Sequence, residues 1–320
     1  MPKSKRNKTL TLTQEETQRL LSRCVSSCNL KSDTPEDFRD IIVCGDAFDT
    51  ANRLPRRAFD LMIVDPPYNL TKSYGGEKFY KRSADEYAEF TEKWIDAFYP
   101  SLKPTASVYV CCDFMSGVVV APILAKRFKL RNRITWQREK GRGAKNNWKN
   151  GMEDIWFCTV GDDYRFDLAS VRQRRRVLAP YRENGKPKDW FTDGGEKYRD
   201  TCPSNFWDDV TVPYWSMSEN TAHPTQKPEK LIAKLVLASS KKGDLVLDPF
   251  GGSGTTAAVA KKLGRHYLSI EKNPEYCAYA EARIERAETD PSIQGYEDGI
   301  FYARGAQGVR SGRKKEGENG

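Results

Sequence analysis

The chain has 320 residues, a length that suits one large catalytic domain with a smaller insertion, although two independent domains also fit. Its 53 Lys and Arg against 44 Asp and Glu give a formal net charge of +9. This charge favours a polyanionic partner, with nucleic acid as the first candidate, but composition alone fits an ordinary basic protein equally well.

Membrane-spanning, secreted and metal-dependent classes are disfavoured by the same sequence. The most apolar stretch, residues 117–125, contains Pro122 and is too short to span a bilayer. The basic start leads into a polar segment, so we expect no secretory signal. Eight scattered Cys and two His suggest neither a zinc framework nor a disulfide lattice. We therefore expect an intracellular protein with reduced thiols and no metal.

The first 35 residues predict a basic arm that leads into one helix, because Thr13 and Glu16 have the spacing of a capping box. From residue 36 to about residue 160, short apolar runs alternate with helical patterns. Apolar runs of this length, followed by polar residues, are typical of buried parallel strands. We expect strands at residues 41–43, 61–64, 107–112 and 134–136, and a helix at residues 84–99.

Residues 161–220 break this alternation, being rich in Arg, Pro, Gly and aromatic residues, so we expect an inserted region that reads the substrate. Alternation resumes over residues 221–290, with helices at 229–240, 256–263 and from Asn273 onward, and strands at 245–247 and 266–270. Residues 291–320 are expected to be a tail, disordered from about residue 305. The whole pattern predicts an α/β fold with a doubly wound, mostly parallel sheet.

The first chemical signal is Asp65-Pro66-Pro67-Tyr68, directly after an apolar strand. The amino group of a nucleobase is a poor nucleophile unless both of its N–H bonds find acceptors. Asp65 offers a carboxylate, and Pro66 offers a carbonyl whose direction is fixed by two successive residues with locked φ. Tyr68 offers a ring on which a base rotated out of a duplex can stack. A plain Pro-Pro turn at a strand end is the alternative.

The second signal is the stretch from Asp248 to Thr255, which reads strand, glycine-rich loop, helix. Glycines let the backbone approach a ligand, and the following helix N-terminus favours a carboxylate. No Lys follows the last glycine, so the loop is not a Walker A motif. Glu271 ends the next strand, where an acidic side chain suits ribose hydroxyls. Loop, strand and acid together favour an adenosyl ligand over a structural turn.

These motifs carry a family resemblance. The stretch Asp65–Tyr68, then His223-Pro224-Thr225-Gln226-Lys227-Pro228, then Asp248–Thr255, in that order, resembles the beta class of amino-group DNA methyltransferases. The resemblance covers about residues 41–285. It implies the fold of S-adenosylmethionine-dependent methyltransferases with a circularly rearranged motif order, a prokaryotic, cytoplasmic and DNA-associated enzyme, and double-stranded DNA as partner.

The resemblance also implies roles for individual residues. Residues 36–160 would form the catalytic half, 161–220 the target-recognition region and 221–290 the cofactor-binding half. Asp65, Pro66, Pro67 and Tyr68 would be catalytic. The cofactor, S-adenosyl-L-methionine, leaves as S-adenosyl-L-homocysteine. Its expected contacts are Asp46, Ala47, Asp65, Pro66, His223, Thr225, Lys227, Pro228, Asp248, Phe250, Gly251, Gly252, Ser253, Gly254, Thr255, Glu271, Lys272 and Asn273.

Among these contacts, Asp46 and Ala47 would border the cofactor adenine, Thr225 and Lys227 would hold its methionine end, and Glu271 its ribose. His223 would lie against the cofactor, with a capping or core histidine as the alternative.

The target base is expected to be adenine, because Asp rather than Ser at position 65 points to adenine N6 in this family. Cytosine N4 is the runner-up. Cytosine C5 is disfavoured, since that carbon needs a thiolate nucleophile and the chain contains no Pro-Cys dipeptide. A non-enzymatic DNA-binding protein on the same scaffold, and an RNA or protein-glutamine methyltransferase, remain further alternatives.

DNA contacts are expected in two places. A basic loop with glycine hinges follows the strand at 134–136, and we expect it to be mobile without DNA. Trp136 would stack on the target base or else lie in the core. The insertion adds a second basic group. The expected DNA-binding residues are Trp136, Arg138, Lys140, Arg142, Lys145, Arg172, Arg174, Arg175, Arg176, Lys186 and Lys188, each with a merely solvated charge as the alternative.

Overall fold

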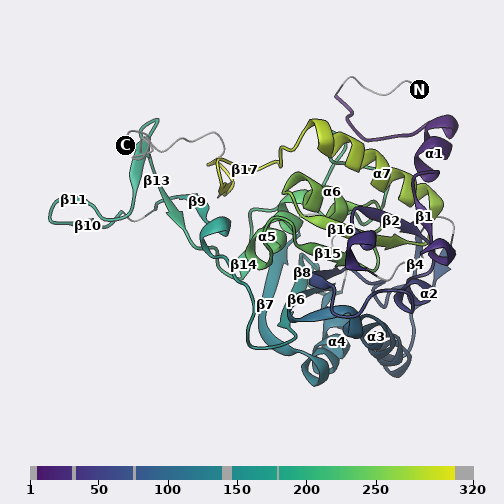
Figure 1. Ribbon diagram of the computed structural model, residues 1–320. Coiled ribbons are helices and arrows are strands. Elements are labelled where there is room, and N and C mark those ends of the chain that lie inside the picture. Colours follow the sequence, from purple (N-terminus) through teal and green to yellow (C-terminus); the bar gives the residue numbers. More distant parts are fainter. Residues whose placement is uncertain (1–5, 31–33, 75–76, 139–145, 179, 307–320) are drawn as a thin grey trace.

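A nine-stranded central sheet organises the protein (Figure 1). The computed structural model describes residues 6–30, 34–74, 77–138, 146–178 and 180–306. Neighbouring strands of the sheet run parallel, except that β8 is antiparallel to both of its neighbours. In spatial order the strands are β1 (Val25–Ser26), β2 (Ile41–Cys44), β16 (His266–Glu271), β15 (Leu245–Asp248), β3 (Phe59–Val64), β6 (Leu102–Cys112), β8 (Met152–Thr159), β7 (Lys129–Gln137) and β14 (Phe206–Trp207).

Helices cover both faces of this sheet (Figure 1). One face carries α5 (Glu229–Ser239), α6 (Thr255–Lys262) and α7 (Pro274–Thr289). The other carries α2 (Ala47–Ala51), α3 (Ala84–Phe98) and α4 (Phe114–Arg127). The predicted doubly wound, mostly parallel α/β fold is therefore confirmed. No helix among the described residues is both long and apolar enough to cross a bilayer.

Strand β3 shows how the sequence builds this layered core. Leu61 and Ile63 belong to the cluster under α5 and α6, whereas Met62 and Val64 belong to the cluster under α3 and α4. Side chains alternate across a strand, so a strand covered on both faces must be apolar throughout. This is why residues 61–64 of β3 read as one continuous apolar run in the sequence.

The N-terminal arm and its helix lie along the outside of this core. Helix α1 (Gln14–Leu21) begins with the expected capping box, in which Thr13 and Glu16 bond to each other's backbone. Its Arg19 forms an ion pair with Glu285 of α7. The remaining short elements are η1 (Ser27–Asn29), η2 (Pro35–Phe38), η3 (Tyr99–Ser101), η4 (Ala169–Val171) and the hairpin β4 (Lys72–Tyr74) with β5 (Glu77–Phe79).

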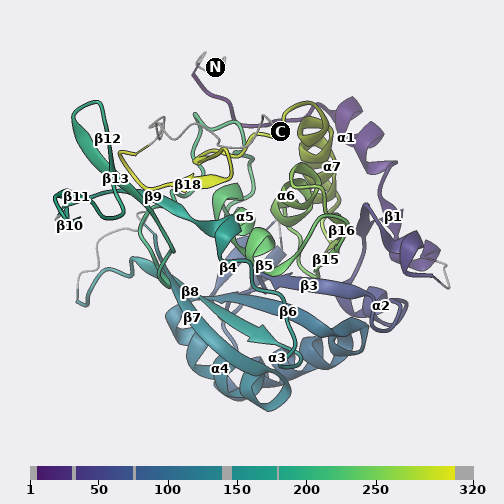
Figure 2. The ribbon, with the colours of Figure 1, turned by 60° about the vertical axis from the view of Figure 1, so that its left-hand side comes forward.

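Strands of the inserted region and two C-terminal strands form a second, five-stranded sheet that stands away from the central one (Figure 2). Its order is β12 (Phe191–Asp193), β13 (Glu196–Thr201), β9 (Gln173–Arg176), β18 (Ile300–Tyr302) and β17 (Tyr296–Glu297). A small hairpin, β10 (Arg182–Glu183) with β11 (Lys186–Pro187), projects beyond it (Figure 1). The insertion joins the central sheet through β14, which pairs with β7.

The end of the chain differs from the expected tail after residue 290. Strand β18 pairs in parallel with β9, and Phe301 is fully buried beside the insertion. The C-terminal strands and the insertion thus share one sheet, although more than 100 residues separate the paired strands β9 and β18 in the sequence. The expected disorder begins at about residue 305; of that stretch, Ala306 is described and is buried, and residues 307–320 lie outside the described part of the chain.

Candidate active site

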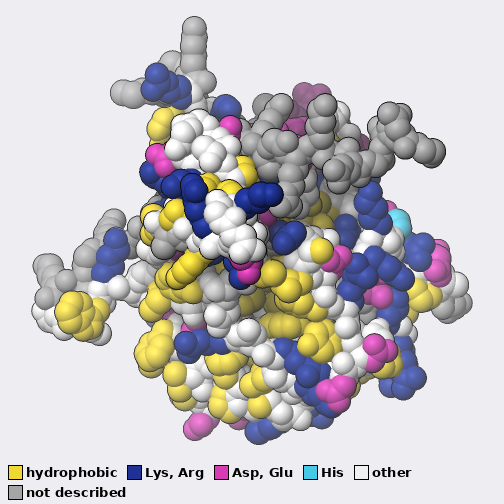
Figure 3. Space-filling view, turned by 90° about the vertical axis from the view of Figure 1, so that its left-hand side faces the viewer, with side chains coloured by type: hydrophobic (Ala, Val, Ile, Leu, Met, Phe, Trp, Pro, Cys, Tyr) yellow, Lys and Arg dark blue, Asp and Glu magenta, His cyan; other side chains and the backbone are white. Residues whose placement is uncertain are grey.

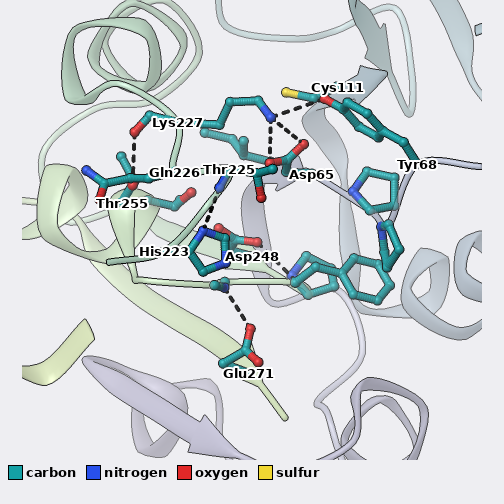
Figure 4. Close-up of a pocket in the computed structure, with 18 of the residues that line it drawn as sticks. Asp65, Tyr68, Cys111, His223, Thr225, Gln226, Lys227, Asp248, Thr255 and Glu271 are labelled. Atoms are coloured by element: carbon teal, nitrogen blue, oxygen red, sulfur yellow. Dashed lines mark hydrogen bonds and ion pairs between the residues drawn. The ribbon is translucent and has the colours of Figure 1, made fainter. Parts of the chain in front are cut away.

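Five strands of the central sheet end at one cavity of about 400 Å³ (Figure 4). They are β2, β16, β15, β3 and β6, which run in the same direction and so present their carboxyl ends at one edge. Asp65 follows β3, Asp248 ends β15 and Glu271 ends β16. Tyr68 and Phe250, from the two sequence motifs, both line this cavity. The fold therefore brings the tetrapeptide and the glycine loop together.

The glycine loop is held open by its own backbone geometry. Gly252 has φ +52°, and its N–H donates to the Glu271 carboxylate at 2.9 Å (Figure 4). A Cβ on this residue would lie 3.0 Å from Nε2 of His223. Glycine is required here because L-residues rarely adopt this φ and because the His223 ring packs directly above. The loop thus places backbone N–H groups at the start of α6.

Asp248 and Glu271 give this half of the cavity an acidic character. Burial raises the pKa of Asp248 to about 7, and the neighbouring Asp65 and Glu271 carboxylates also raise it. A cation bound nearby would stabilise the ionised form. S-adenosylmethionine carries a sulfonium and an ammonium group. Its charges therefore fit the acidic side chains of this cavity.

His223 lies between the glycine loop and α7. Its Nδ1 accepts a hydrogen bond from the backbone N–H of Thr225 at 3.3 Å, and its ring meets Tyr276 edge to face at 4.5 Å. The ring also lines the cavity beside Gly252. His223 therefore has a structural role in its loop and lines the cavity, and its contact with the cofactor stays a prediction.

The tetrapeptide is fixed at the other end of the cavity. The Pro67 carbonyl accepts from the Tyr87 hydroxyl of α3 at 3.2 Å. The Tyr68 hydroxyl donates to Glu153 Oε2 at 3.3 Å. Burial raises the pKa of Tyr68 well above its usual value, so this hydroxyl keeps its proton. These contacts leave the Asp65 carboxylate and the Tyr68 ring facing the same cavity.

Lys227 forms the main ion pair of the site. Its Nζ lies 2.7 Å and 2.6 Å from the two oxygens of Asp65 and 3.1 Å from the Tyr68 hydroxyl (Figure 4). Burial alone would lower the pKa of Lys227, but Asp65 and Glu153 raise it, so the ammonium stays charged. The resemblance assigns Lys227 to the methionine end of the cofactor, and that role stays a prediction.

Most of the expected cofactor residues line this one cavity. Three do not: Pro228 caps α5, Asn273 caps α7, and Gly254 packs against Ala280. Those that line it are Asp46, Ala47, Asp65, Pro66, His223, Thr225, Lys227, Asp248, Phe250, Gly251, Gly252, Ser253, Thr255, Glu271 and Lys272. Which of them bind the cofactor stays a prediction.

Sequence reasoning missed the cavity residues contributed by β8 and the segment before it. Asn150, Met152 and Glu153 line the cavity, and Glu153 is buried. Strand β8 is antiparallel, so its amino end meets the carboxyl ends of its neighbours. The acidic pair Glu153-Asp154 directly before the apolar run at residues 155–158 was the local signal that could have found it.

The structure buries two of the expected DNA contacts: Trp136 takes the core position that was its alternative, and Arg174 is corrected. Trp136 is buried in the core and donates its indole N–H to the Val210 carbonyl at 2.8 Å, so it is unavailable to a flipped base. Arg174 is buried and forms a two-pronged pair with Asp200 on the adjacent strand, at 2.7 and 2.8 Å. In both cases a partner on a distant segment satisfies the polar group.

The other expected DNA contacts lie at or near the surface. Arg138 lies at the mouth of the cavity and pairs with Glu153. Arg172, Lys186 and Lys188 are exposed on the insertion. Arg175 and Arg176 pair with Asp208 and Glu196 and remain partly accessible. Figure 3 shows Lys and Arg side chains gathered over the insertion, which faces the viewer there. Lys140, Arg142 and Lys145, with the predicted loop mobility, lie outside the described residues.

Comparison with known sequences places this site in a family. Residues 59–282 match the DNA methylase family of N6 and N4 methyltransferases. The chain is 32% identical over 247 residues to the type II methyltransferase M.HpaI of Haemophilus parainfluenzae, covering 76% of this chain and 74% of that protein. It is 33% identical over 253 residues to the DNA adenine methyltransferase YhdJ of Escherichia coli K12, covering 77% and 83%.

Solved structures share the fold. The PvuII DNA methyltransferase, which is cytosine-N4-specific, has a TM-score of 0.58 at 20% identity and covers 78% of this chain and 90% of its own. A DNA modification methylase of Thermus thermophilus, complexed with S-adenosyl-L-methionine, has a TM-score of 0.54 at 20% identity and covers 83% and 98%. Within the described residues, no cluster of three His, Cys, Asp or Glu side chains is arranged to hold a metal ion. The chain therefore belongs to the S-adenosylmethionine-dependent N6/N4 DNA methyltransferases.

Proposed function

We propose that this protein methylates N6 of adenine in duplex DNA by direct in-line transfer after base flipping, as the modification enzyme of a type II restriction-modification system. The observation that carries the proposal is the meeting of Asp65–Tyr68 with the glycine loop in one cavity. One end offers acceptors for an amino group, and the other suits a positively charged cofactor. Bound S-adenosylmethionine supplies the methyl group.

The residues of the tetrapeptide would prepare the nucleophile. Asp65 and the Pro66 carbonyl accept the two N6–H bonds, which localises the nitrogen lone pair and aims it across the cavity. Tyr68 stacks on the flipped base. Asp248 and Glu271 favour binding of the positively charged cofactor at the other end. Orientation and preorganised electrostatics therefore account for the rate, without a covalent enzyme intermediate.

The insertion is proposed to hold the DNA. Its exposed Arg172, Lys186 and Lys188 supply charge for the phosphate backbone, and Arg138, which lines the cavity, adds a further positive charge. Arginine side chains in the same region suit guanine edges in the major groove.

Cytosine N4 is the second candidate, because the same acceptors suit any exocyclic amino group. The matched family includes both N6 and N4 enzymes, and the PvuII enzyme with the same fold acts on cytosine. Asp at position 65 and the 33% identity to a DNA adenine methyltransferase favour adenine. A non-enzymatic scaffold is less favoured, because both motifs are intact.

The test is methylation of plasmid DNA with labelled cofactor, followed by digestion to nucleosides. We expect N6-methyladenine; N4-methylcytosine would overturn the adenine assignment, and label on RNA or protein alone would overturn DNA as the substrate. The motif set also resembles the RsrI adenine methyltransferase, so a GAATTC duplex is the first defined substrate to try. Protection of the product from a restriction enzyme reading the same site would support the restriction-modification role.

The Asp65→Ala variant tests the mechanism. It removes a carboxylate acceptor for the amino group, so we expect turnover to fall by at least about 100-fold, while DNA affinity stays within about twofold. Single-turnover methylation and equilibrium DNA binding provide the two measurements. Retained methylation would contradict the role assigned to Asp65.

A further inference from the structure

Glu153 is a buried carboxylate near the proposed acceptor Asp65, and both contact Lys227. It is 5% exposed and comes from β8, which runs antiparallel to its neighbours in the central sheet. Burying an ionised carboxylate is unfavourable unless its oxygens are paired. Glu153 is paired with the Tyr68 hydroxyl, the Lys227 ammonium and the Arg138 guanidinium.

The contacts of Glu153 fix the orientation of Tyr68. The Tyr68 hydroxyl accepts from Lys227 Nζ at 3.1 Å and donates to Glu153 Oε2 at 3.3 Å. A hydroxyl that both accepts and donates in this way has its rotation and its ring tilt restrained. Burial keeps the pKa of Tyr68 well above its usual value, so the proton needed for donation is present.

Glu153 also competes with Asp65 for Lys227. The Lys227 ammonium lies 2.6 Å from Asp65 Oδ2 and 3.5 Å from Glu153 Oε2. Every hydrogen bond that Lys227 gives to Asp65 lowers the capacity of that carboxylate to accept from a substrate amino group. The negative charge of Glu153 attracts the Lys227 ammonium away from Asp65.

We propose that Glu153 is a positioning residue of the methyl-transfer reaction: it anchors the Tyr68 ring and shares Lys227 with Asp65, so that Asp65 keeps acceptor capacity for the target amino group. The inference rests on the proposed function, because it concerns the same amino group. It adds a residue that no motif of the sequence contains. Glu153 acts through Tyr68 and Lys227 and does not itself touch the reacting atoms.

The Glu153→Gln variant separates charge from shape. The amide keeps a carbonyl that can accept from Tyr68 but loses the negative charge that attracts Lys227. We expect the single-turnover rate to fall by about 10- to 100-fold, with the Kd for cofactor and for DNA changed less than about threefold. A target-site 2-aminopurine should show altered fluorescence, because the ring against which it stacks is held less firmly.

The matched control is Glu281→Gln. Glu281 is also a buried glutamate, 5% exposed and paired with an arginine, Arg23, at 3.3 Å, but it lies on α7 and does not line the cavity. We expect wild-type rates from this control. A rate loss equal to that of Glu153→Gln would show a general effect of removing a buried charge and would overturn the inference.

Tyr68→Phe provides the second variant, because it removes only the hydroxyl that Glu153 accepts from. In a double-variant cycle, the combined loss of rate should be smaller than the product of the two single losses, since both changes act on the same contact: Tyr68→Phe removes its donor and Glu153→Gln removes the charge of its acceptor. Independent effects, an unchanged rate in Glu153→Gln, or a loss confined to cofactor affinity would each overturn the inference. Absence of DNA methylation by the wild-type protein would instead refute the proposed function.

Discussion

At the scale of single residues, the buried Asp248 carboxylate links cofactor binding to pH. Burial raises its pKa to about 7, with Asp65 and Glu271 adding to the rise. A bound cation would favour the ionised form, so below pH 7 cofactor binding must first remove a proton. We expect cofactor affinity to weaken by about tenfold for each pH unit below 7, as measured by isothermal titration calorimetry. A pH-independent Kd between about pH 5.5 and 8 would contradict this linkage.

The same carboxylate makes folding stability depend on pH in the opposite direction: cofactor affinity falls as pH is lowered, whereas stability falls as pH is raised. Its pKa in the folded, cofactor-free protein is raised, so its contribution to stability is fully present below the unfolded pKa near 4 and is lost as pH rises through 7. We therefore expect Asp248→Asn to raise the free energy of unfolding by about 1–3 kcal/mol over the wild type at pH 8, which shifts the denaturant midpoint to higher concentration. Near pH 4 the two proteins should be equally stable. Equal denaturant midpoints of the two proteins at pH 8 would show that the ionised Asp248 carboxylate does not destabilise the folded protein.

Gly252 depends on both backbone conformation and space. Its φ is +52°, and an added Cβ would lie 3.0 Å from His223 Nε2. We expect Gly252→Ala to cost about 1–2 kcal/mol of stability and to weaken cofactor binding by at least about tenfold. The control is Gly243→Ala, at φ +84° with no neighbour within 4 Å, which has the backbone strain alone. Similar cofactor affinity in the two variants would mean that the His223 contact is unimportant.

At the scale of elements, a buried charge cluster fastens the insertion to α5. Asp209 lies 2.6 Å from Lys230 Nζ and 3.0 Å from Lys234 Nζ, and all three side chains are at most 10% exposed. Lys230 also donates to the Tyr302 carbonyl of β18 at 2.6 Å. Burial alone would raise the pKa of Asp209, but the two lysines lower it to about 2. The cluster of Asp209, Lys230 and Lys234 therefore connects α5, the insertion and the C-terminal strand.

Removing this carboxylate should uncouple the three segments. Asp209→Asn leaves two buried lysines without their counter-charge, so we expect a loss of about 3–5 kcal/mol in the free energy of unfolding, measured with urea. Asp208→Asn is the matched control, because its side chain is 42% exposed and pairs with Arg175 at the surface. We expect less than about 1 kcal/mol there. Equal losses would show that the cluster has no special role.

At the scale of the whole molecule, the cavity and most of the proposed DNA surface lie on different elements. The cavity is formed mainly by the strand ends of the central sheet, whereas Arg172, Lys186 and Lys188 lie exposed on the insertion (Figures 1 and 3). Cofactor binding and DNA binding should therefore be separable by mutation. Phosphate contacts release counterions, so salt dependence reports on them directly.

The hairpin of β10 and β11 offers a direct test. We expect the double variant Lys186→Ala, Lys188→Ala to weaken DNA binding and to reduce the log–log salt slope by about 0.9 for each phosphate that is no longer neutralised, with cofactor affinity unchanged. Fluorescence anisotropy between about 50 and 200 mM salt measures this slope. Lys126→Ala with Arg127→Ala, on α4 away from the insertion, is the control. A slope unchanged by the hairpin variant would remove the hairpin from the DNA surface.

The sequence by itself determined the alternation of strands and helices and the two motifs at strand ends. Both are local patterns: β3 is apolar because helices cover both of its faces, and its end is marked by Asp65 and two prolines. Parallel strands then bring their carboxyl ends to one edge, so the convergence of Tyr68 with Phe250 followed from strand direction.

Only the tertiary structure decided which charged and aromatic side chains are free. Trp136 and Arg174 are residue types that often contact DNA, but both are buried and hydrogen-bonded to partners from other segments of the chain. Strand β9 reads Gln-Arg-Arg-Arg and shows no apolar alternation, and the strand that completes its pairing, β18, comes more than 100 residues later. Glu153 lines the cavity because β8 is antiparallel, which places the amino end of this strand beside the carboxyl ends of its neighbours. Burial and long-range pairing depend on which segments meet, and a local pattern carries no information about that.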